Sequence, residues 1–286
     1  MLSELHGASL SGSLGGNGNL GDDAGVRAVV RMLPTVMVAA AVASGLVVAP
    51  GHAAGVEPLP SASNVDYQLG GAYAPAKGVG IVVRDSTAPP VPGAYNVCYV
   101  NGFQTQPDAR SFWRKRPGLV LRRHGNPVVD PGWPDEWLLN ISTAAKRKRL
   151  ATIVGRSITG CAAAGYQGVE FDNFDSFTRS RGMLKARHAN AFARLLVRAA
   201  HRAGLAAGQK NRASYDGRRL GFDFVVAESC GRWNECADYV AHYGNQVLAI
   251  EYRRSDFRRA CAQIGARVPV VLADRELSVG GPRAWC

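Results

Sequence analysis

From residue 64 onward, the apolar and polar positions form two kinds of segment that follow one another. Short runs rich in β-branched and aromatic residues are separated by longer runs rich in Ala and Leu. This order is typical of βα units, in which helices join parallel strands. Nine runs are candidate strands: 65–69, 80–84, 95–100, 137–141, 168–172, 206–210, 224–228, 247–251 and 268–272.

Three of the longer runs show the apolar repeat of a helix. Ser142 is placed to cap the first, whose apolar positions follow a 3.6-residue period up to Gly165. The second has its apolar stripe between residues 192 and 203, and Gly204 is placed to end it. The third spans 256–264. Each is long enough to cross back over a sheet.

The repeated order of helix, glycine, turn and strand favours a barrel or a doubly wound sheet. No glycine-rich phosphate-binding sequence follows an early strand, so a nucleotide cofactor has no cradle, and we expect no cofactor. The fold class we predict is therefore α/β, a single-domain (β/α)₈ TIM-type barrel. Nine strands are one too many for this barrel, so one of them must be peripheral.

The first 54 residues differ in composition from the rest. Residues 1–31 include a Gly, Ser and Asn tract, which indicates a disordered or upstream extension. Residues 32–54 contain an apolar run followed by small residues, the pattern of a removable signal peptide. A membrane anchor is the alternative, but the run is shorter than the ~20 residues that a span needs. We expect a secreted, extracellular protein whose domain is 55–286.

All six cysteines lie in that domain, and an even number behind an export signal suggests disulfides. Cys230 and Cys236 can close a small loop, and Cys286 could hold the C-terminus against Cys261. Elimination leaves Cys98 with Cys161. This pairing is a hypothesis, and the absence of a C-x-x-C sequence makes a zinc site unexpected.

The formal net charge is +12, which could attract nucleic acid, an anionic polymer or a membrane surface. The basic residues are spread along the chain, however, and the densest run, 146–149, falls on a predicted helix. A solvated helix face explains that run. We therefore expect no nucleic acid partner, no stable membrane insertion and a monomer.

The stretch GVEFDNFDSF (168–177) crowds Glu170, Asp172 and Asp175 at the end of an apolar strand. Side chains alternate along a barrel strand, so Val169 and Phe171 should face the helices while Glu170 and Asp172 face inward. The carboxyl ends of the strands are the face on which barrel enzymes build their sites. We expect these acids to converge on a cleft.

Polar residues end most of the other strands as well. They are Asp85, Asn101, Lys210, Asn211, Glu228, Glu251 and Tyr252, and Asn173 directly follows Asp172 in the acidic stretch. An alternative is that some acids only form ion pairs at strand ends, such as Arg84 with Glu170 or Lys210 with Asp175. Asp172 with Asn173 and Asp175 could also ligate calcium, but the run lacks the pattern of an EF-hand loop, so we expect no metal.

Two carboxylates that face each other across a cleft are what glycosidic bond cleavage requires. We assign Asp172 and Glu228 as this pair and expect the other polar strand-end residues to bind substrate. The sequence does not fix which of the two is the nucleophile; the preferred assignment is Asp172 as nucleophile and Glu228 as acid. Lys210 would keep its carboxylate neighbour ionised. Aromatic side chains in the loops can pack against sugar rings; Trp233 is the preferred candidate among Tyr99, Phe103, Trp113, Trp133, Phe174, Phe177, Trp233 and Tyr252.

The stretches DYQLGGAY, VVRDSTAPPVPGAYNVCYVNGFQTQ, WPDEWLLN, GVEFDNFDS, GQKN, VAESC and IEY occur in this order between residues 66 and 252. In these stretches the chain resembles glycoside hydrolase family 114, the endo-α-1,4-polygalactosaminidases. The resemblance implies a (β/α)₈ barrel that cleaves galactosamine polymers internally, with catalytic carboxylates at Asp172 and Glu228. A barrel that binds carbohydrate without cleaving it is the alternative. The acetylation state of the substrate stays open, because a basic protein repels a polymer of free amines at long range.

Overall fold

The computed structural model describes residues 55–286. The predicted extension (1–31) and signal peptide (32–54) lie outside the described residues. Within the described part, no helix combines the length and the apolar character needed to cross a membrane.

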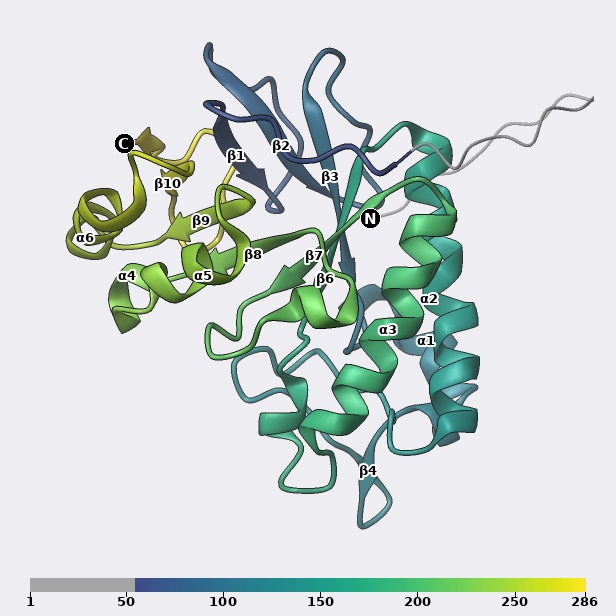
Figure 1. Cartoon of the computed structure of the whole chain (residues 1–286). Helices are drawn as coiled ribbons and strands as arrows, with labels where there is room; N and C mark the ends of the chain where they lie inside the picture. Colours follow the sequence, from purple (N-terminus) through teal and green to yellow (C-terminus); the bar gives the residue numbers. More distant parts are fainter. Residues whose placement is uncertain (1–54) are drawn as a thin grey trace, which may run out of the picture. The chain divides into compact units, whose positions relative to one another are not determined.

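Eight parallel strands form a nearly closed barrel, and a ninth short strand is antiparallel to the last of them (Figure 1). The order in the sheet is β1-β2-β3-β6-β7-β8-β9-β10-β11. The bounds are β1 Asn64–Gln68, β2 Val79–Asp85, β3 Tyr95–Asn101, β6 Gly168–Asp172, β7 Ala206–Lys210, β8 Phe224–Glu228, β9 Val247–Glu251, β10 Val270–Leu272 and β11 Ala284–Trp285. A separate hairpin pairs β4 Arg122–Arg123 with β5 Asn126–Pro127.

The helices surround the barrel unevenly. Their bounds are α1 Arg110–Arg114, α2 Ala144–Ala164, α3 Ala186–Arg202, α4 Cys230–Trp233, α5 Cys236–Tyr243 and α6 Arg254–Ile264, with 3₁₀ turns η1 Pro107–Ala109, η2 Pro117–Leu119, η3 Ser176–Arg179 and η4 Gly217–Leu220. In the described chain, loops alone connect β1 to β2 and β2 to β3, and only the 3₁₀ turn η4 lies between β7 and β8, so the regular βα repeat that we predicted is incomplete. Figure 1 shows α2 and α3 side by side along one flank.

Successive side chains of each strand point to opposite faces of the sheet, so the protein has two cores: one inside the barrel, and an outer core between the barrel and its helices. Tyr67, Val83 and Val226 belong to the barrel interior. Val169 and Phe171 instead pack with the buried faces of α2 and α3, as we expected from the strand period. Gly208 is required inside the barrel, because a Cβ there would lie 2.5 Å from the ring of Phe224.

The peripheral strand is 137–141. It makes only isolated bridges, including Val120 with Leu139, within the long segment that connects β3 to α2. Its apolar residues Leu138, Leu139 and Ile141 are buried in the outer core, which explains why the sequence pattern indicates a strand. That connecting segment places residues 130–133 and Glu136 beside Asp172 and Glu228 at the carboxyl ends of the strands.

The cap of α2 differs from the prediction by one residue. Thr143 Oγ1 accepts the Lys146 backbone N–H, whereas the Ser142 hydroxyl donates to Asn140. Ser142 is therefore the wrong assignment, because the hydroxyl one position later reaches the free N–H groups of the first turn. Gly165, with φ of 94°, ends the helix as predicted.

Three disulfides join Cys98 to Cys161, Cys230 to Cys236 and Cys261 to Cys286, the pairing expected from the sequence. The first and third close loops of 63 and 25 residues. By loop-closure entropy each stabilises the fold by about 3.5 to 4.5 kcal/mol. The third holds the C-terminal segment against α6, where β11 pairs with β10 and the Trp285 indole donates to Val65 O of β1. This segment therefore bridges the gap between the last and first barrel strands.

Candidate active site

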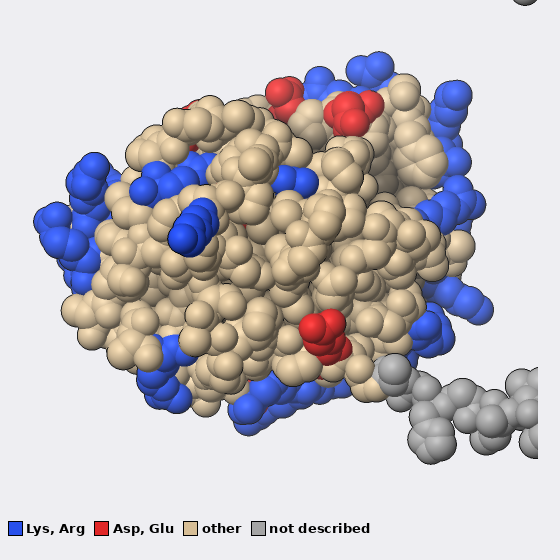
Figure 2. All heavy atoms as spheres, turned by 90° about the horizontal axis from the view of Figure 1, so that it is seen from above, with Lys and Arg blue, Asp and Glu red and all other residues tan. Residues whose placement is uncertain are grey.

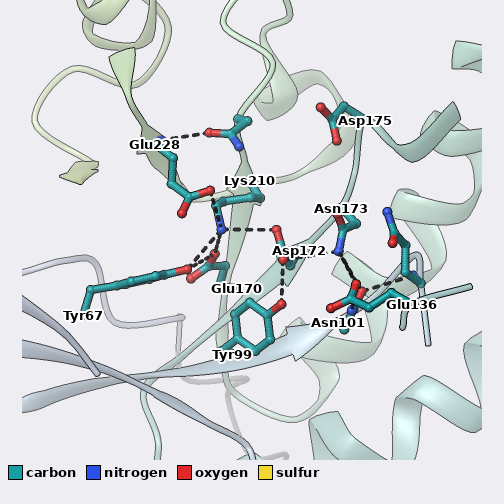
Figure 3. A network of polar contacts seen from close by, with 12 residues as sticks. Tyr67, Tyr99, Asn101, Glu136, Glu170, Asp172, Asn173, Asp175, Lys210 and Glu228 are labelled. Atoms are coloured by element: carbon teal, nitrogen blue, oxygen red, sulfur yellow. Dashed lines mark hydrogen bonds and ion pairs between the residues drawn. The ribbon is translucent and has the colours of Figure 1, made fainter. Parts of the chain in front are cut away.

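A single buried ammonium group joins three carboxylates at the carboxyl ends of β6, β7 and β8 (Figure 3). Lys210 Nζ lies 2.9 Å from Glu170 Oε1, 3.2 Å from Asp172 Oδ1 and 3.3 Å from Glu228 Oε2. The oxygens of Asp172 and Glu228 that contact this nitrogen are therefore at most about 6.5 Å apart. Residues distant in sequence thus meet at one point.

Asp172 is held in its ionised form. Burial raises the pKa of its carboxyl, but the Lys210 charge and the hydrogen bond from the Tyr99 hydroxyl outweigh burial and lower it. That hydroxyl donates to Asp172 Oδ2 at 2.6 Å, and the Asn173 amide donates to the same oxygen at 3.3 Å. An ionised carboxylate with both oxygens directed by donors is suited to act as a nucleophile.

Glu228 has the more open position of the pair. Its side chain is 28% exposed, against 18% for Asp172. The Tyr252 hydroxyl donates to Glu228 Oε1, and the Glu228 backbone N–H donates to Asn211 Oδ1 at 2.8 Å. The carboxyl group is therefore oriented by Tyr252, directly after β9, and by Lys210 at the end of β7, while it stays accessible to solvent and ligand.

Glu170 lies one layer deeper than Asp172 and is fully buried. Its Oε1 accepts hydrogen bonds from Lys210 and from the Tyr67 hydroxyl. Burial raises the pKa of Glu170 to about 7, against the lowering effect of Lys210. The suggested partner Arg84 is wrong, because that guanidinium donates to Gln68 and to backbone carbonyls. Glu170 supports Lys210 from below and does not line the cleft.

The cleft above this cluster has two adjoining halves. The larger, of about 430 Å³, is lined by Leu69, Gly70, Asp85, Tyr99, Gln106, Pro107, Trp133, Glu136, Asp172, Lys210, Glu228, Tyr252, Arg275, Glu276 and Leu277. The smaller, of about 300 Å³, is lined by Asp130, Pro131, Gly132, Trp133, Asp172, Asn173, Asp175, Arg179, Asn211 and Glu228. Asp172, Glu228 and Trp133 belong to both halves. A bound chain that ran through both halves would cross the two carboxylates.

The structure brings most of the predicted site residues to this cleft, but not all. Asp85, Asn173, Asp175 and Asn211 line it together with the central cluster. Asn101 lies behind it, where its amide donates to Glu136. Asp175 is paired with Arg179 at 3.0 Å and not with Lys210, so that suggested ion pair is wrong.

Two other predicted site residues lie away from the cleft. Trp233 is 64% exposed, but it does not line either half. Glu251 is fully buried and accepts the Gly231 backbone N–H. Of the aromatic candidates, Phe103 and Phe174 are buried in the outer core, whereas Trp133 is exposed at the cleft. Glu251 ends β9 on the outer face that it shares with Val247 and Ala249, so alternation along the strand directs it away from the barrel interior. Trp233 ends the short helix α4, and its direction does not follow from any strand.

Glu136 is a cleft residue that the strand-end argument missed, since it follows no barrel strand. Its Oε2 accepts from the Asn101 amide at 2.8 Å and from the Asn173 amide at 3.5 Å. Burial raises its pKa to about 7, and the Asn101 hydrogen bond acts in the opposite direction. The one available signal was the pair of acids, Asp135 and Glu136, between two tryptophans in WPDEW.

Charge is distributed differently in the cleft and over the surface. Seven acids and three bases line the two halves, although the chain as a whole has a net charge of +12. On the face shown in Figure 2, Lys and Arg are dispersed and form no continuous patch. The cleft is therefore locally anionic on a basic protein.

Among the described residues, one group has the spacing of a metal site: Cys230, Cys236 and Glu251. Its two sulfurs are bonded to each other, so they cannot act as thiolate ligands.

Three buried glutamates predict an unusual pH dependence of stability. Burial raises the pKa of Glu136, Glu170 and Glu251 from 4.5 to about 7. At a pH between these two pKa values, the three carboxyl groups are ionised in the unfolded chain but protonated in the folded protein. The free energy of unfolding should therefore fall as pH rises from 5 to 7. Each group contributes on the order of a few kcal/mol, at about 1.4 kcal/mol per pKa unit. Urea denaturation at a series of pH values measures this slope.

The matched variant for that prediction is Glu251→Gln, because an amide resembles the protonated acid and Oε1 can still accept from Gly231. The histidines and the acidic groups with lowered pKa also change the free energy of unfolding with pH, in the opposite direction. Their contributions are the same in wild type and variant, so they cancel when the two slopes are compared. The slope should become shallower in the variant. An unchanged slope would show that Glu251 is ionised at neutral pH.

A parallel barrel that presents two carboxylates across a cleft at the carboxyl ends of its strands defines a glycoside hydrolase. Comparison with known proteins agrees. The model of glycoside hydrolase family GH114 matches residues 47–286. The chain therefore belongs to glycoside hydrolase family 114. No curated protein sequence matches it.

Two solved structures are similar in fold. Aspergillus fumigatus Ega3, in complex with galactosamine, is 22% identical with a TM-score of 0.65, covering 81% of this chain and 98% of that one. The glycoside hydrolase domain of PelA from Pseudomonas aeruginosa is 17% identical with a TM-score of 0.57, covering 78% and 98%. At these identities the likeness concerns the fold, which is the barrel predicted from the sequence.

Proposed function

We propose that the protein is a secreted enzyme that cleaves internal α-1,4 bonds of a galactosamine-containing polysaccharide. The observation that carries this proposal is the convergence of Asp172 and Glu228 on one ammonium group, in the middle of a cleft. A cleft that continues on both sides of the carboxylates suits a polymer cut away from its ends.

Asp172 and Glu228 have different roles in the mechanism we propose. Asp172 attacks the anomeric carbon of the sugar, and the glycosidic C–O bond breaks as Glu228 donates its proton to the leaving oxygen. This step leaves a sugar ester on Asp172. Glu228 then removes a proton from water, the water oxygen bonds to the anomeric carbon, and the Asp172 carboxylate departs. The residues end in their starting protonation states.

Lys210 and Tyr99 support the role of Asp172 as nucleophile. Their contacts lower the pKa of Asp172, so the attacking group is ionised over the neutral range. Tyr252 donates to the Glu228 oxygen that does not contact Lys210, which directs that carboxyl toward the cleft. The two carboxyl groups are thereby held in place before substrate binds.

The local charge of the cleft supports an amino sugar as substrate. The surplus of acids over bases in the cleft attracts a cationic chain at short range. The long-range repulsion expected from the net charge is screened beyond about 8 Å at physiological ionic strength. The complex of Ega3 with galactosamine is consistent with this choice. The three disulfides support an extracellular location.

The test is hydrolysis of a galactosamine polymer by the purified domain, followed by reducing-end release and product size. We expect a rapid fall in chain length with short oligomers as products, and retention of the α configuration in the first product seen by NMR. We expect retention because the two oxygens are at most about 6.5 Å apart, a bound that admits the ~5–5.5 Å separation of retaining enzymes and reaches only the lower end of the ~6.5–9.5 Å inverting range.

Two outcomes would contradict the proposal in different ways. A first-formed β product would exclude the ester on Asp172. Tight binding of the polymer without any release of reducing ends would favour a carbohydrate-binding barrel instead.

A further inference from the structure

Two neighbouring helices carry many bases and no acids. α2 and α3 lie side by side along one flank of the barrel (Figure 1), and neither contains Asp or Glu. Seven of their bases are exposed: Lys148, Arg149 and Arg156 on α2, and Arg187, Arg194, Arg198 and Arg202 on α3. The basic run 146–149, which we attributed to a solvated helix face, is therefore one part of a larger basic surface that the packing of the two helices assembles.

These bases have no acidic partners within the described chain. Among residues 55–286, none of the seven forms an ion pair. The ion pair on these helices joins His201 to Asp223 at 2.7 Å. Burial, together with the charges of Arg187 on α3 and Arg147 on α2, lowers the pKa of His188. Bases of both helices thus create a positive potential at one place, which favours a bound anion.

A groove of about 430 Å³ lies between the two helices. Lys148 of α2 and Arg198 and Arg202 of α3 line it, and no acid does. Arg198 and Arg202 are separated by about 6 Å along the axis of α3, so they can contact successive charges of one chain. The groove shares no lining residue with either half of the catalytic cleft, so an occupant leaves Asp172 and Glu228 accessible.

The lining of the groove restricts which polyanion fits it. The half-buried lining residues are small or aliphatic, among them Ala151, Leu195 and Ala199, whereas the three bases are exposed at the rim. No aromatic side chain lines the groove, although single-stranded nucleic acid is usually bound by stacking of its bases on such side chains. A nucleic acid duplex presents its phosphates on a convex surface, which reaches the rim but not the floor.

A membrane surface is also a poor match for this flank. The exposed large apolar side chains of the described chain all lie outside α2 and α3. Interfacial helices bind a bilayer by burying an exposed apolar face in addition to basic residues. A groove with charged rims and an aliphatic floor instead suits one flexible chain that carries negative charges and no aromatic groups.

We propose that the groove between α2 and α3 binds a single chain of an acidic polysaccharide and so tethers the enzyme to an anionic matrix with its active site free. Lys148, Arg198 and Arg202 pair with the carboxylates of the chain, and the arginine forks can do so through two hydrogen bonds each. The sugar rings lie over the aliphatic floor. This inference goes beyond the proposed hydrolysis, because it concerns a polymer of the opposite charge and a surface outside the cleft.

Titration of polygalacturonate oligomers into the purified protein, followed by calorimetry at several salt concentrations, tests the proposal. The triple variant Lys148→Glu/Arg198→Glu/Arg202→Glu should raise Kd at least about tenfold at physiological ionic strength. Its affinity should also depend less steeply on salt, because fewer ions are released when the chain binds.

The matched control is Arg254→Glu/Arg258→Glu/Arg267→Glu. These three bases are exposed on or directly after α6, which lies on the opposite side of the barrel from α2 and α3 (Figure 1). Both triple variants lower the net charge by the same amount. Kd for polygalacturonate should stay within about threefold of wild type in the control, since long-range charge effects are screened at this ionic strength.

Gly155→Phe distinguishes the groove from the basic surface around it. A Cβ at Gly155 would meet no other element within 4 Å, so the ring can fill the groove without displacing α2 and without changing the charge. Kd for polygalacturonate should rise at least about tenfold. Gly160 is equally open on the same helix but does not line the groove, so Gly160→Phe should leave Kd unchanged. Thermal melting of each variant identifies losses that come from unfolding.

Four outcomes would overturn the proposal, and none of them depends on whether the protein hydrolyses a galactosamine polymer. The first is no binding of polygalacturonate at physiological ionic strength. The second is equal weakening by the two triple variants, which would make net charge the cause. The third is normal binding by Gly155→Phe, which would place the polymer outside the groove. The fourth is tighter binding of a short DNA duplex or of phosphatidylglycerol vesicles that is lost in the Lys148 triple variant, which would assign the flank to nucleic acid or to a membrane.

Discussion

Replacement of Asp172 by Asn should abolish hydrolysis of the galactosamine polymer while the barrel stays folded. An amide cannot form the ester with the anomeric carbon, so we expect kcat to fall by about 10³-fold or more. The variant keeps the side-chain shape, and the Tyr99 hydroxyl can still donate to the amide oxygen. Reducing-end release under saturating substrate measures the effect, and thermal melting checks the fold.

Asp175→Asn is the matched control for this variant. Asp175 belongs to the same acidic stretch and lines the smaller half of the cleft, but it is paired with Arg179 and does not contact Lys210. Its loss should affect KM more than kcat, with a far smaller loss of turnover. Turnover of Asp172→Asn within about tenfold of wild type would exclude Asp172 as the nucleophile.

Replacement of Glu228 by Gln should give a loss that depends on the leaving group. Proton donation by a positioned acid contributes about 10²- to 10⁴-fold, so the polymer, whose leaving group is a sugar alcohol, should show a loss of that size. An aryl glycoside with an acidic phenol needs no proton at departure. Formation of the sugar ester from it should therefore be nearly normal, visible as a burst of phenol before slow turnover.

Glu276→Gln is the control for Glu228, because Glu276 is another acid that lines the larger half of the cleft. It should show no such dependence on the leaving group. If Glu228→Gln reduced the ester-forming step equally for both substrates, Glu228 would have a role in orientation and not as the acid.

Much of the barrel could be predicted from local pattern. The bounds of β6, β7, β8 and β9 equal the predicted ranges, because each is an apolar run of one strand length bordered by turns. The run 137–141 has the same composition but lies outside the barrel. Burial of Leu138 and Leu139 in the outer core requires the same side chains as burial in a sheet. Local pattern cannot distinguish the two.

The candidate site shows the same limit. Asp172 and Glu228 could be located from the sequence, because each is the last residue of a parallel strand and such residues lie at the carboxyl rim of the barrel. Trp233 was misplaced and Glu136 was missed. Both lie on segments whose direction depends on long-range contacts, such as the hydrogen bonds that hold Asp130 to Gln104 and Arg179.

The sequence by itself determined the barrel class, the inward direction of Glu170 and Asp172, and the strand ends that carry Lys210 and Glu228. The barrel class follows from the alternation of strand-like and helix-like runs, and the inward directions follow from the two-residue period of a strand; both patterns are local. Only the tertiary structure decided that one ammonium group joins three carboxylates, and that a loop after β3 brings Trp133 and Glu136 over them. These contacts depend on how the sheet curves and on where the long connection after β3 packs. Both are determined by contacts between residues that are far apart in the chain.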